Sequence, residues 1–128
     1  MKELLLTIDV KCLEPLCVDG KNQKVVMVPF TGVAKGEFFN GEVLGNGVDT
    51  QRYKKDGTSS LSARYMIEGT DYKGEKCRVF IENNVNGDSW VPTITTDSQN
   101  LKEWEDDKLC STVEGAAEGV TVKIFKIS

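Results

Sequence analysis

The sequence predicts an all-β protein that folds as a single antiparallel, up-and-down β-barrel of about eight or nine strands with one short helix. Turn residues recur about every 8–12 positions, which is the spacing typical of sandwiches and barrels. The segments between the turns are short and rich in alternating or β-branched residues. Consecutive segments are joined by hairpin signals, and a closed barrel joins such hairpins without leaving edge strands.

Length and composition predict one ordinary globular domain over residues 1–128. The chain is 39% hydrophobic and 28% charged, with a net charge of −4. This acidic balance argues against a nucleic-acid surface, which would carry a basic patch. No apolar run approaches the roughly 18 residues of a membrane span, and the apolar run near the N-terminus is too short for a signal peptide. We therefore expect a cytoplasmic protein with no nucleic-acid and no membrane partner.

The chain has four cysteines, none of them in a Cys-x-x-Cys pair, and no histidine. This pattern predicts no metal site and no cofactor, and free thiols packed as small apolar groups. Lack of histidine also excludes nucleophiles activated by histidine. Any proton transfer must therefore use Asp, Glu, Lys, Tyr or Cys.

The first third of the chain reads as three strands. Alternating apolar residues predict a strand over 4–10, and β-branched residues predict another over 24–28. Pro29 lacks a backbone donor, so the second strand should end, bulge or lie at an edge there. A third strand is expected over 37–44, where Gly41 indicates a bulge or a close backbone approach.

A hairpin is predicted over residues 48–68, turning on Asp56 and Gly57. An Asp-Gly pair between two strand-like segments favours a two-residue type I′ turn, in which both central residues have φ > 0. Counted outward from that loop, Asp49 lies directly opposite Arg64. The sequence thus predicts a carboxylate and a guanidinium side by side in the middle of the sheet.

A second hairpin joins residues 59–70 to residues 75–83. Gly74 fits the left-handed position of a three-residue loop that ends in a bulge. In this register Arg64 faces Glu82, apolar residues face apolar residues, and opposite charges face each other, which supports the pairing.

The remaining chain is predicted as a turn-rich loop over 83–88, a strand over 90–96 and a short helix over 99–106. Asp97 or Ser98 would cap that helix. Two further strands are expected over 108–113 and 119–127.

The two registers together predict an acid–base–acid row of Asp49, Arg64 and Glu82 across three strands. Gln51, Ser62 and Tyr53 flank this row. If the row lines the barrel, Arg64 can bind a carboxylate or phosphate and Asp49 can orient it. If the row faces water, it is a cross-strand charge ladder worth roughly 0.2–1 kcal/mol per pair.

Several motifs occur in an order that resembles a known bacterial family. They are residues 28–32, 36–44 and 47–49, the Ser62-Ala63-Arg64-Tyr65 element, and then Asp71 and Asn83-Asn84. This order resembles the uncharacterised family called domain of unknown function 3237. The resemblance implies a small β-barrel with no assigned reaction and no cofactor. It also implies that Asp49 and Arg64, which match signature positions of the family, belong to the site.

These observations support two hypotheses about function. The first is a barrel that binds a small polar or anionic molecule, with lyase- or isomerase-like acid–base chemistry at Asp49 or Glu82 as an extension. The candidate ligand-binding side chains are Arg64, Asp49, Tyr53, Gln51 and Ser62. The alternative is a non-catalytic interaction or scaffold module whose charged row is exposed. A homodimer is compatible with both, and the solvent exposure of Arg64 distinguishes them.

Overall fold

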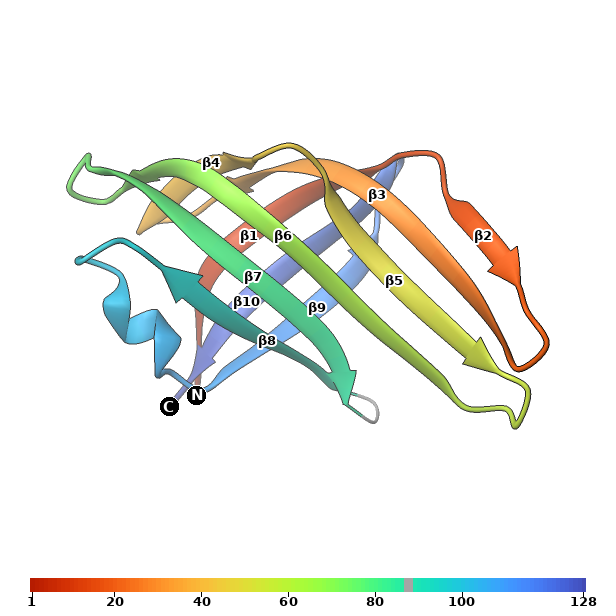
Figure 1. Cartoon of the computed structure of the whole chain (residues 1–128). Coiled ribbons are helices and arrows are strands. Elements are labelled where there is room, and N and C mark those ends of the chain that lie inside the picture. The colour runs from red at the N-terminus through yellow and green to blue at the C-terminus, as the bar shows by residue number, and fades with distance from the viewer. Residues whose placement is uncertain (87–88) are drawn as a thin grey trace.

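The computed structural model describes residues 1–86 and 89–128, and in this part the chain forms ten strands and one 3-10 turn (Figure 1). The elements are β1 Lys2–Cys12, β2 Leu16–Asp19, β3 Gln23–Lys35, β4 Phe39–Val43, β5 Gly47–Lys54, β6 Ser59–Asp71, β7 Lys76–Asn86, β8 Ser89–Thr96, η1 Lys102–Glu105, β9 Leu109–Gly115 and β10 Gly119–Ile127.

All pairings are antiparallel, and consecutive strands pair with each other except β1 with β2 and β4 with β5. β1 pairs with β10 and with β3, which closes the sheet into a barrel. β5 takes over from β4 between β3 and β6, and β2 takes over from β1 along β3. The predicted up-and-down barrel is therefore confirmed, with eight strands around the barrel and two extra strands created by these interruptions.

Strand β3 continues through Pro29 and does not end there, but the alternative of an edge is confirmed, because neither β1 nor β2 pairs with β3 at this residue. The Pro29 carbonyl accepts a hydrogen bond from the Leu13 backbone N–H at 2.8 Å, so it points toward the break between β1 and β2. In an antiparallel ladder the N–H and C=O of one residue point to the same neighbour. The donor that proline lacks would therefore face that break, and the ladder to β5 loses nothing.

The close backbone approach predicted at Gly41 is confirmed. Gly41 on β4 pairs with Gly69 on β6. A Cβ added at Gly41 would lie 2.5 Å from the carbonyl oxygen of Glu68. Two glycines facing each other let these strands cross closer than side chains would permit.

The predicted register of the first hairpin was wrong by one residue. The Lys54 N–H donates to the Thr58 carbonyl at 2.8 Å, and the Gly57 N–H donates to the Lys54 carbonyl at 3.0 Å. Among the described residues only glycines have positive φ, with 93° at Gly57, so Asp56 cannot form a type I′ turn. The loop therefore has three residues and ends in a bulge at Gly57.

The register set by this three-residue loop places Val48, not Asp49, opposite Arg64. A shift of one residue moves every side chain of a strand to the other face of the sheet. In the second hairpin, Gly74 has φ 79° and Arg64 faces Glu82, as predicted. Asp49 and Arg64 consequently lie on opposite faces of the sheet.

The core fills the half of the barrel near the chain termini. Its fully buried side chains include Leu6, Ile8, Phe39, Ile67, Val79, Ile81 and Ile124. Leu101 and Trp104 are 2% and 5% exposed and close this end of the barrel. Of the helix predicted over 99–106 only the 3-10 turn η1 forms, and the cap predicted at Asp97 or Ser98 was wrong, because η1 follows Leu101 and has no side-chain cap.

Asp71, at the end of β6, is a buried carboxylate that accepts four hydrogen bonds. The Ser98 hydroxyl and the Asn100 amide each donate at 2.9 Å, and the backbone N–H groups of Lys73 and Glu75 donate at 3.0 and 3.1 Å. The hydrogen bond from Asn100 is the main cause that lowers the pKa of Asp71, and Ser98 and the backbone donors act in the same direction. Asp71 thus joins the β6–β7 turn to the segment that closes the barrel.

We expect Asp71→Asn to lower the melting temperature by several degrees at neutral pH. Both oxygens of Asp71 accept hydrogen bonds, and in the variant an NH₂ group that cannot accept replaces one of them. The folded pKa of Asp71 lies below the ordinary 3.8, so its stabilisation is complete above that value and is lost as the pH falls through the folded pKa. Thermal unfolding from neutral pH to acid pH should show the two proteins converging in acid. The exposed Asp106→Asn serves as the control; an equal loss there would contradict the role of Asp71.

Strand β7 extends through Asn86, so the loop predicted over 83–88 was wrong for its first four residues. Asn84 pairs with Val91, and Val85 pairs with Trp90. The remaining two residues of that predicted loop, 87 and 88, lie outside the described residues.

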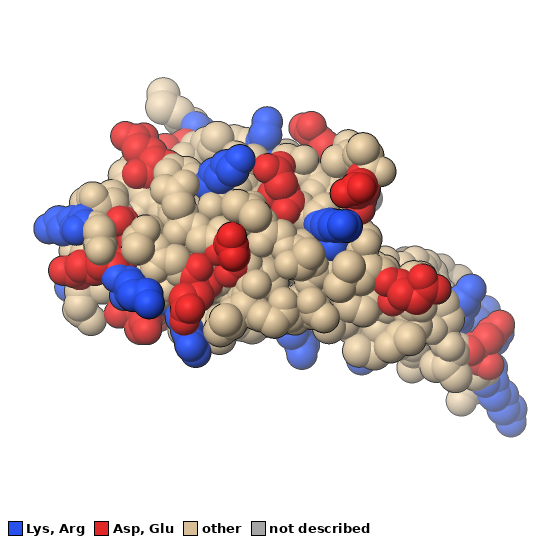
Figure 2. All heavy atoms as spheres, turned by 90° about the horizontal axis from the view of Figure 1, so that it is seen from above, with Lys and Arg blue, Asp and Glu red and all other residues tan. Residues whose placement is uncertain are grey.

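On the face shown in Figure 2, acidic and basic side chains are interspersed, with no large patch of one sign. Within the described residues, no helix is long and apolar enough to cross a bilayer.

Candidate functional site

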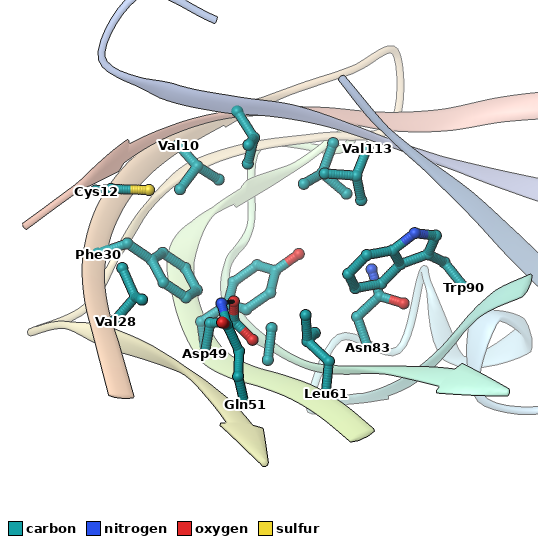
Figure 3. A pocket seen from close by; sticks show the side chains of 14 residues that line it. Val10, Cys12, Val28, Phe30, Asp49, Gln51, Leu61, Asn83, Trp90 and Val113 are labelled. Atoms are coloured by element: carbon teal, nitrogen blue, oxygen red, sulfur yellow. Dashed lines mark hydrogen bonds between the residues drawn. The ribbon is translucent and has the colours of Figure 1, made fainter. Parts of the chain in front are cut away.

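A cavity of about 220 Å³ lies inside the barrel, at the end opposite Trp104 (Figure 3). Most of its lining is apolar and comes from β1, β3, β6, β9 and β10, with Val10, Val28, Phe30, Leu61, Val113 and Val122. The polar side chains that reach it are Asp49, Gln51, Tyr65 and Asn83, together with Cys12 and Trp90. In Figure 3, Asp49 and Gln51 extend from β5 on one side, and Asn83 and Trp90 lie further along on the other.

Strand alternation explains how these groups come together. Asp49 is directly opposite Ala63, and Ala63 is directly opposite Asn83. Directly opposed residues share a face of the sheet, so the inward row across β5, β6 and β7 is Asp49–Ala63–Asn83. The small Ala63 side chain leaves open space between the carboxylate and the amide.

The next row is shaped by a glycine. Phe30 on β3 is opposite Gly47 on β5, and an added Cβ at Gly47 would lie 2.5 Å from the Phe30 ring and 2.7 Å from the Tyr65 Cβ. The absence of that Cβ lets the Phe30 ring pack edge-on against Tyr65, with centroids 5.3 Å apart. These two rings form an apolar wall of the cavity.

One carboxylate oxygen of Asp49 accepts a hydrogen bond, and the other has none among the described residues. Its Oδ2 accepts a hydrogen bond from Gln51 Nε2 at 2.9 Å, and Gln51 Oε1 accepts one from the Tyr53 hydroxyl at 2.6 Å. Its Oδ1 is buried and has no hydrogen-bond partner among the described residues. Burial raises the pKa of Asp49, and the hydrogen bond from Gln51 offsets only part of that rise.

Tyr65 and Asn83 are the most buried polar side chains of the cavity. Tyr65 is 5% exposed, and its hydroxyl has no partner within residues 1–86 and 89–128. Burial raises the pKa of Tyr65 well above its usual value, so the phenol stays neutral. Asn83 is 2% exposed and accepts a hydrogen bond from the Ser111 hydroxyl at 3.2 Å through Oδ1, and its amide N–H groups can donate to a ligand.

The structure separates the site residues predicted from the sequence. Asp49 and Gln51 line the cavity. Tyr53 is exposed at the rim, and its hydroxyl donates to Gln51. Arg64 and Glu82 lie on the outer face, where Arg64 Nε contacts Glu82 Oε2 at 2.8 Å and the Arg64 side chain is 64% exposed.

The predicted acid–base–acid row is therefore wrong, because it rested on the slipped register of the first hairpin. Its Arg64–Glu82 half is a surface ladder of the kind worth roughly 0.2–1 kcal/mol, and the exposure of Arg64 is the result expected from the alternative in which the charged row faces water. Ser62 alternates with Leu61 and Ala63, which places it on the same outer face of β6.

Tyr65, Asn83 and Trp90 were missed as site residues. The signal for the first two was present, because the confirmed second register puts Tyr65 on the face of Ala63, and Ala63 opposite Asn83. Only the correct three-residue loop at Gly57 brings Asp49 onto that face as well.

A second cavity of about 210 Å³ lies at the other end of the barrel, next to η1. Phe38, Tyr72, Asn100 and Trp104 line part of it, with Phe38 and Tyr72 packed edge to face at 6.0 Å.

Comparison with known proteins identifies similar chains. The family model described as "Protein of unknown function (DUF3237)" matches residues 2–108. A UPF0311 protein from Clostridium acetobutylicum is 28% identical in an alignment 127 residues long that covers 85% of this chain and 79% of that protein.

Two solved structures are similar along the whole chain. The crystal structure of a protein with unknown function from Clostridium acetobutylicum has a TM-score of 0.82 and 26% identity, covering 100% of this chain and 97% of that one. The crystal structure of an enzyme from Penicillium herquei has a TM-score of 0.78 at 17% identity, covering 100% and 94%. The second likeness is one of fold.

Proposed function

The chain belongs to the DUF3237 family, whose description names no activity, and we propose from its cavity that the protein binds a small, uncharged, largely apolar molecule inside the barrel. The observation that carries the proposal is the buried Oδ1 of Asp49, which has no partner in the described chain and lies in an apolar cavity of ligand size. A buried acceptor without a partner costs roughly 1–3 kcal/mol. A ligand hydroxyl or N–H that donates to it would recover part of that cost.

The electrostatics of the cavity favour an uncharged ligand over an anion. Its lining, within the described residues, includes no lysine or arginine, and Asp49 is its acidic group. An anion would meet the Asp49 carboxylate without a compensating cation, and the Arg64 guanidinium lies on the other face of the sheet. The proposal thus keeps the predicted small-molecule ligand but replaces its anionic character.

Acid–base chemistry, if the barrel carries it, belongs to Asp49. A carboxylate in an apolar site is a better proton acceptor than one in water, and Asp49 has an oxygen available to a ligand. Glu82 is paired with Arg64 on the outer face, so we do not assign it a role. The enzyme from Penicillium herquei shares the barrel, which makes the fold compatible with catalysis.

Filling the space over Ala63 should weaken ligand binding. We expect wild-type protein to bind 2-naphthol, an apolar bicyclic molecule with one hydroxyl donor, and Ala63→Leu to weaken that binding at least about tenfold through steric exclusion. Fluorescence titration measures both dissociation constants. The charged analogue 2-naphthoate should bind more weakly than 2-naphthol.

Arg64→Ala is the control for this experiment, because it changes the next residue of β6 on the outer face. Its affinity for 2-naphthol should equal that of wild type. Equal losses in Arg64→Ala and Ala63→Leu, or no binding of 2-naphthol to the wild type, would contradict a ligand site in the barrel.

A further inference from the structure

We propose that the cavity catalyses the enolisation of an uncharged ketone, with Asp49 as the base and Tyr65 as the donor to the carbonyl oxygen. This inference rests on the proposed function, because it assigns a reaction and a substrate class to the same cavity. The reaction moves a proton between a carbon next to the carbonyl group and the Asp49 carboxylate.

Asp49 and Tyr65 lie close enough for one molecule to contact both. Asp49 is opposite Ala63, and Tyr65 follows Ala63 by two residues on the same face of β6. Diagonal neighbours on an antiparallel pair are about 7–8 Å apart, which long side chains can bridge. A molecule lying over Ala63 can therefore contact the carboxylate and the phenol at the same time.

The two groups have complementary chemistry. Within residues 1–86 and 89–128, Asp49 Oδ1 is a buried acceptor without a donor, and the Tyr65 hydroxyl is a buried group without any partner. Neutral donors fixed in an apolar site stabilise a developing oxyanion better than they would in water, because they need no reorganisation. Asn83 can add a second such donor through its amide.

The apolar wall of the cavity orients the Tyr65 phenol and keeps water away from the Asp49 carboxylate. Phe30 packs against the Tyr65 ring, and Gly47 fixes how closely the two approach. The phenol is thereby held in one orientation, as a donor to a carbonyl oxygen must be. The surrounding valines keep the carboxylate poorly hydrated, which strengthens it as a base.

The step balances without a further reactant. Asp49 Oδ1 removes the proton from the α-carbon, the C–H electron pair forms a carbon–carbon double bond, and the carbonyl π pair moves to oxygen. The resulting enolate oxygen accepts the hydrogen bond from Tyr65. The Asp49 carboxylic acid exchanges its proton with water and then returns a proton, or in heavy water a deuteron, to the same carbon or to the far carbon of a conjugated system, which shifts the double bond.

The test is hydrogen–deuterium exchange of 2-tetralone in heavy water, followed by proton NMR of the protons next to the carbonyl group. We expect wild-type protein to accelerate this exchange above buffer at saturating ketone. Tyr65→Phe should slow the rate at saturation about 100-fold, as expected for loss of an oxyanion donor, while 2-naphthol still binds. Asp49→Asn should show no acceleration.

Matched controls make the same chemical changes away from the cavity. Tyr72→Phe lies at the opposite end of the barrel and Asp9→Asn alters an exposed carboxylate, so both should exchange 2-tetralone at the wild-type rate. Tyr65→Phe removes only a hydroxyl without a partner in the described structure, so it should fold as wild type does. Its melting temperature verifies this.

The outcomes separate the two levels of the proposal. Binding of 2-naphthol without accelerated exchange of 2-tetralone, or a Tyr65→Phe rate equal to wild type, overturns the enolisation and leaves the proposed ligand site standing. Binding of 2-naphthol but not of 2-tetralone overturns the ketone assignment in the same way. Failure of 2-naphthol to bind overturns the proposed function itself.

Discussion

Gly69→Ala is expected to lower the free energy of unfolding by about 3 kcal/mol, at the upper end of the cost of inserting one methyl group into a packed site. The added Cβ would run into the Asn40 carbonyl oxygen and the Cα of Gly41, which are backbone atoms of β4. Backbone atoms cannot rotate away as a side chain can, so β4 and β6 would have to separate. Urea denaturation of wild type and variant measures the difference.

Gly115→Ala is the matched control, since this exposed glycine ends β9 and has no atom within 4 Å of the added Cβ. It should unfold within about 0.5 kcal/mol of wild type, as exposed substitutions usually do. If Gly69→Ala were as stable as Gly115→Ala, the close crossing of β4 and β6 would be contradicted.

Asp49→Asn is expected to raise stability at neutral pH while removing proton transfer. The pKa of Asp49 is raised above 3.8 by burial, so the folded protein disfavours the charged form. This penalty is absent below the unfolded pKa and complete above the folded pKa, so wild type loses stability relative to the variant as the pH rises between them. We expect a gain of about 1 kcal/mol, or roughly 4 °C in melting temperature, at neutral pH.

The measurement is thermal unfolding of both proteins from acid to neutral pH. The difference in melting temperature should be small in acid and reach a plateau once Asp49 is ionised. Asp9→Asn is the control, because Asp9 is an exposed carboxylate on the neighbouring part of the barrel wall. A variant that is less stable than wild type at neutral pH would mean that the Asp49 charge is satisfied within the protein.

The fold could be predicted because strand alternation and turn residues are local signals, and most strands pair with their neighbours in the chain. The two hairpins show the limit. Gly74 and Gly57 both occupy left-handed positions that close three-residue loops, but the Asp-Gly pair at 56–57 also fits a two-residue turn. The choice depends on φ at Asp56, which the dipeptide alone does not determine.

The one-residue difference in loop length determines which side chains share a face with Asp49. With the two-residue loop, Asp49 shares a face with Arg64; with the observed loop, it shares a face with Ala63 and Tyr65. Asp49 and Gln51 were predicted as polar site residues and do reach the cavity. Tyr65 lies two residues before Ile67 on the same face of β6, and nothing in the local sequence indicates that the barrel is filled at Ile67 but hollow at Tyr65.

The central claim is that a small uncharged molecule binds beside Asp49 inside the barrel, and side-chain amide resonances test it most directly. Gln51 and Asn83 line the cavity, whereas Asn100 lines the second cavity at the other end. In a titration of nitrogen-15-labelled protein with 2-naphthol, the account predicts that the amide signals of Gln51 and Asn83 shift together and saturate while that of Asn100 stays in place. Unmoved Gln51 and Asn83 signals, or a shift at Asn100 alone, would contradict it.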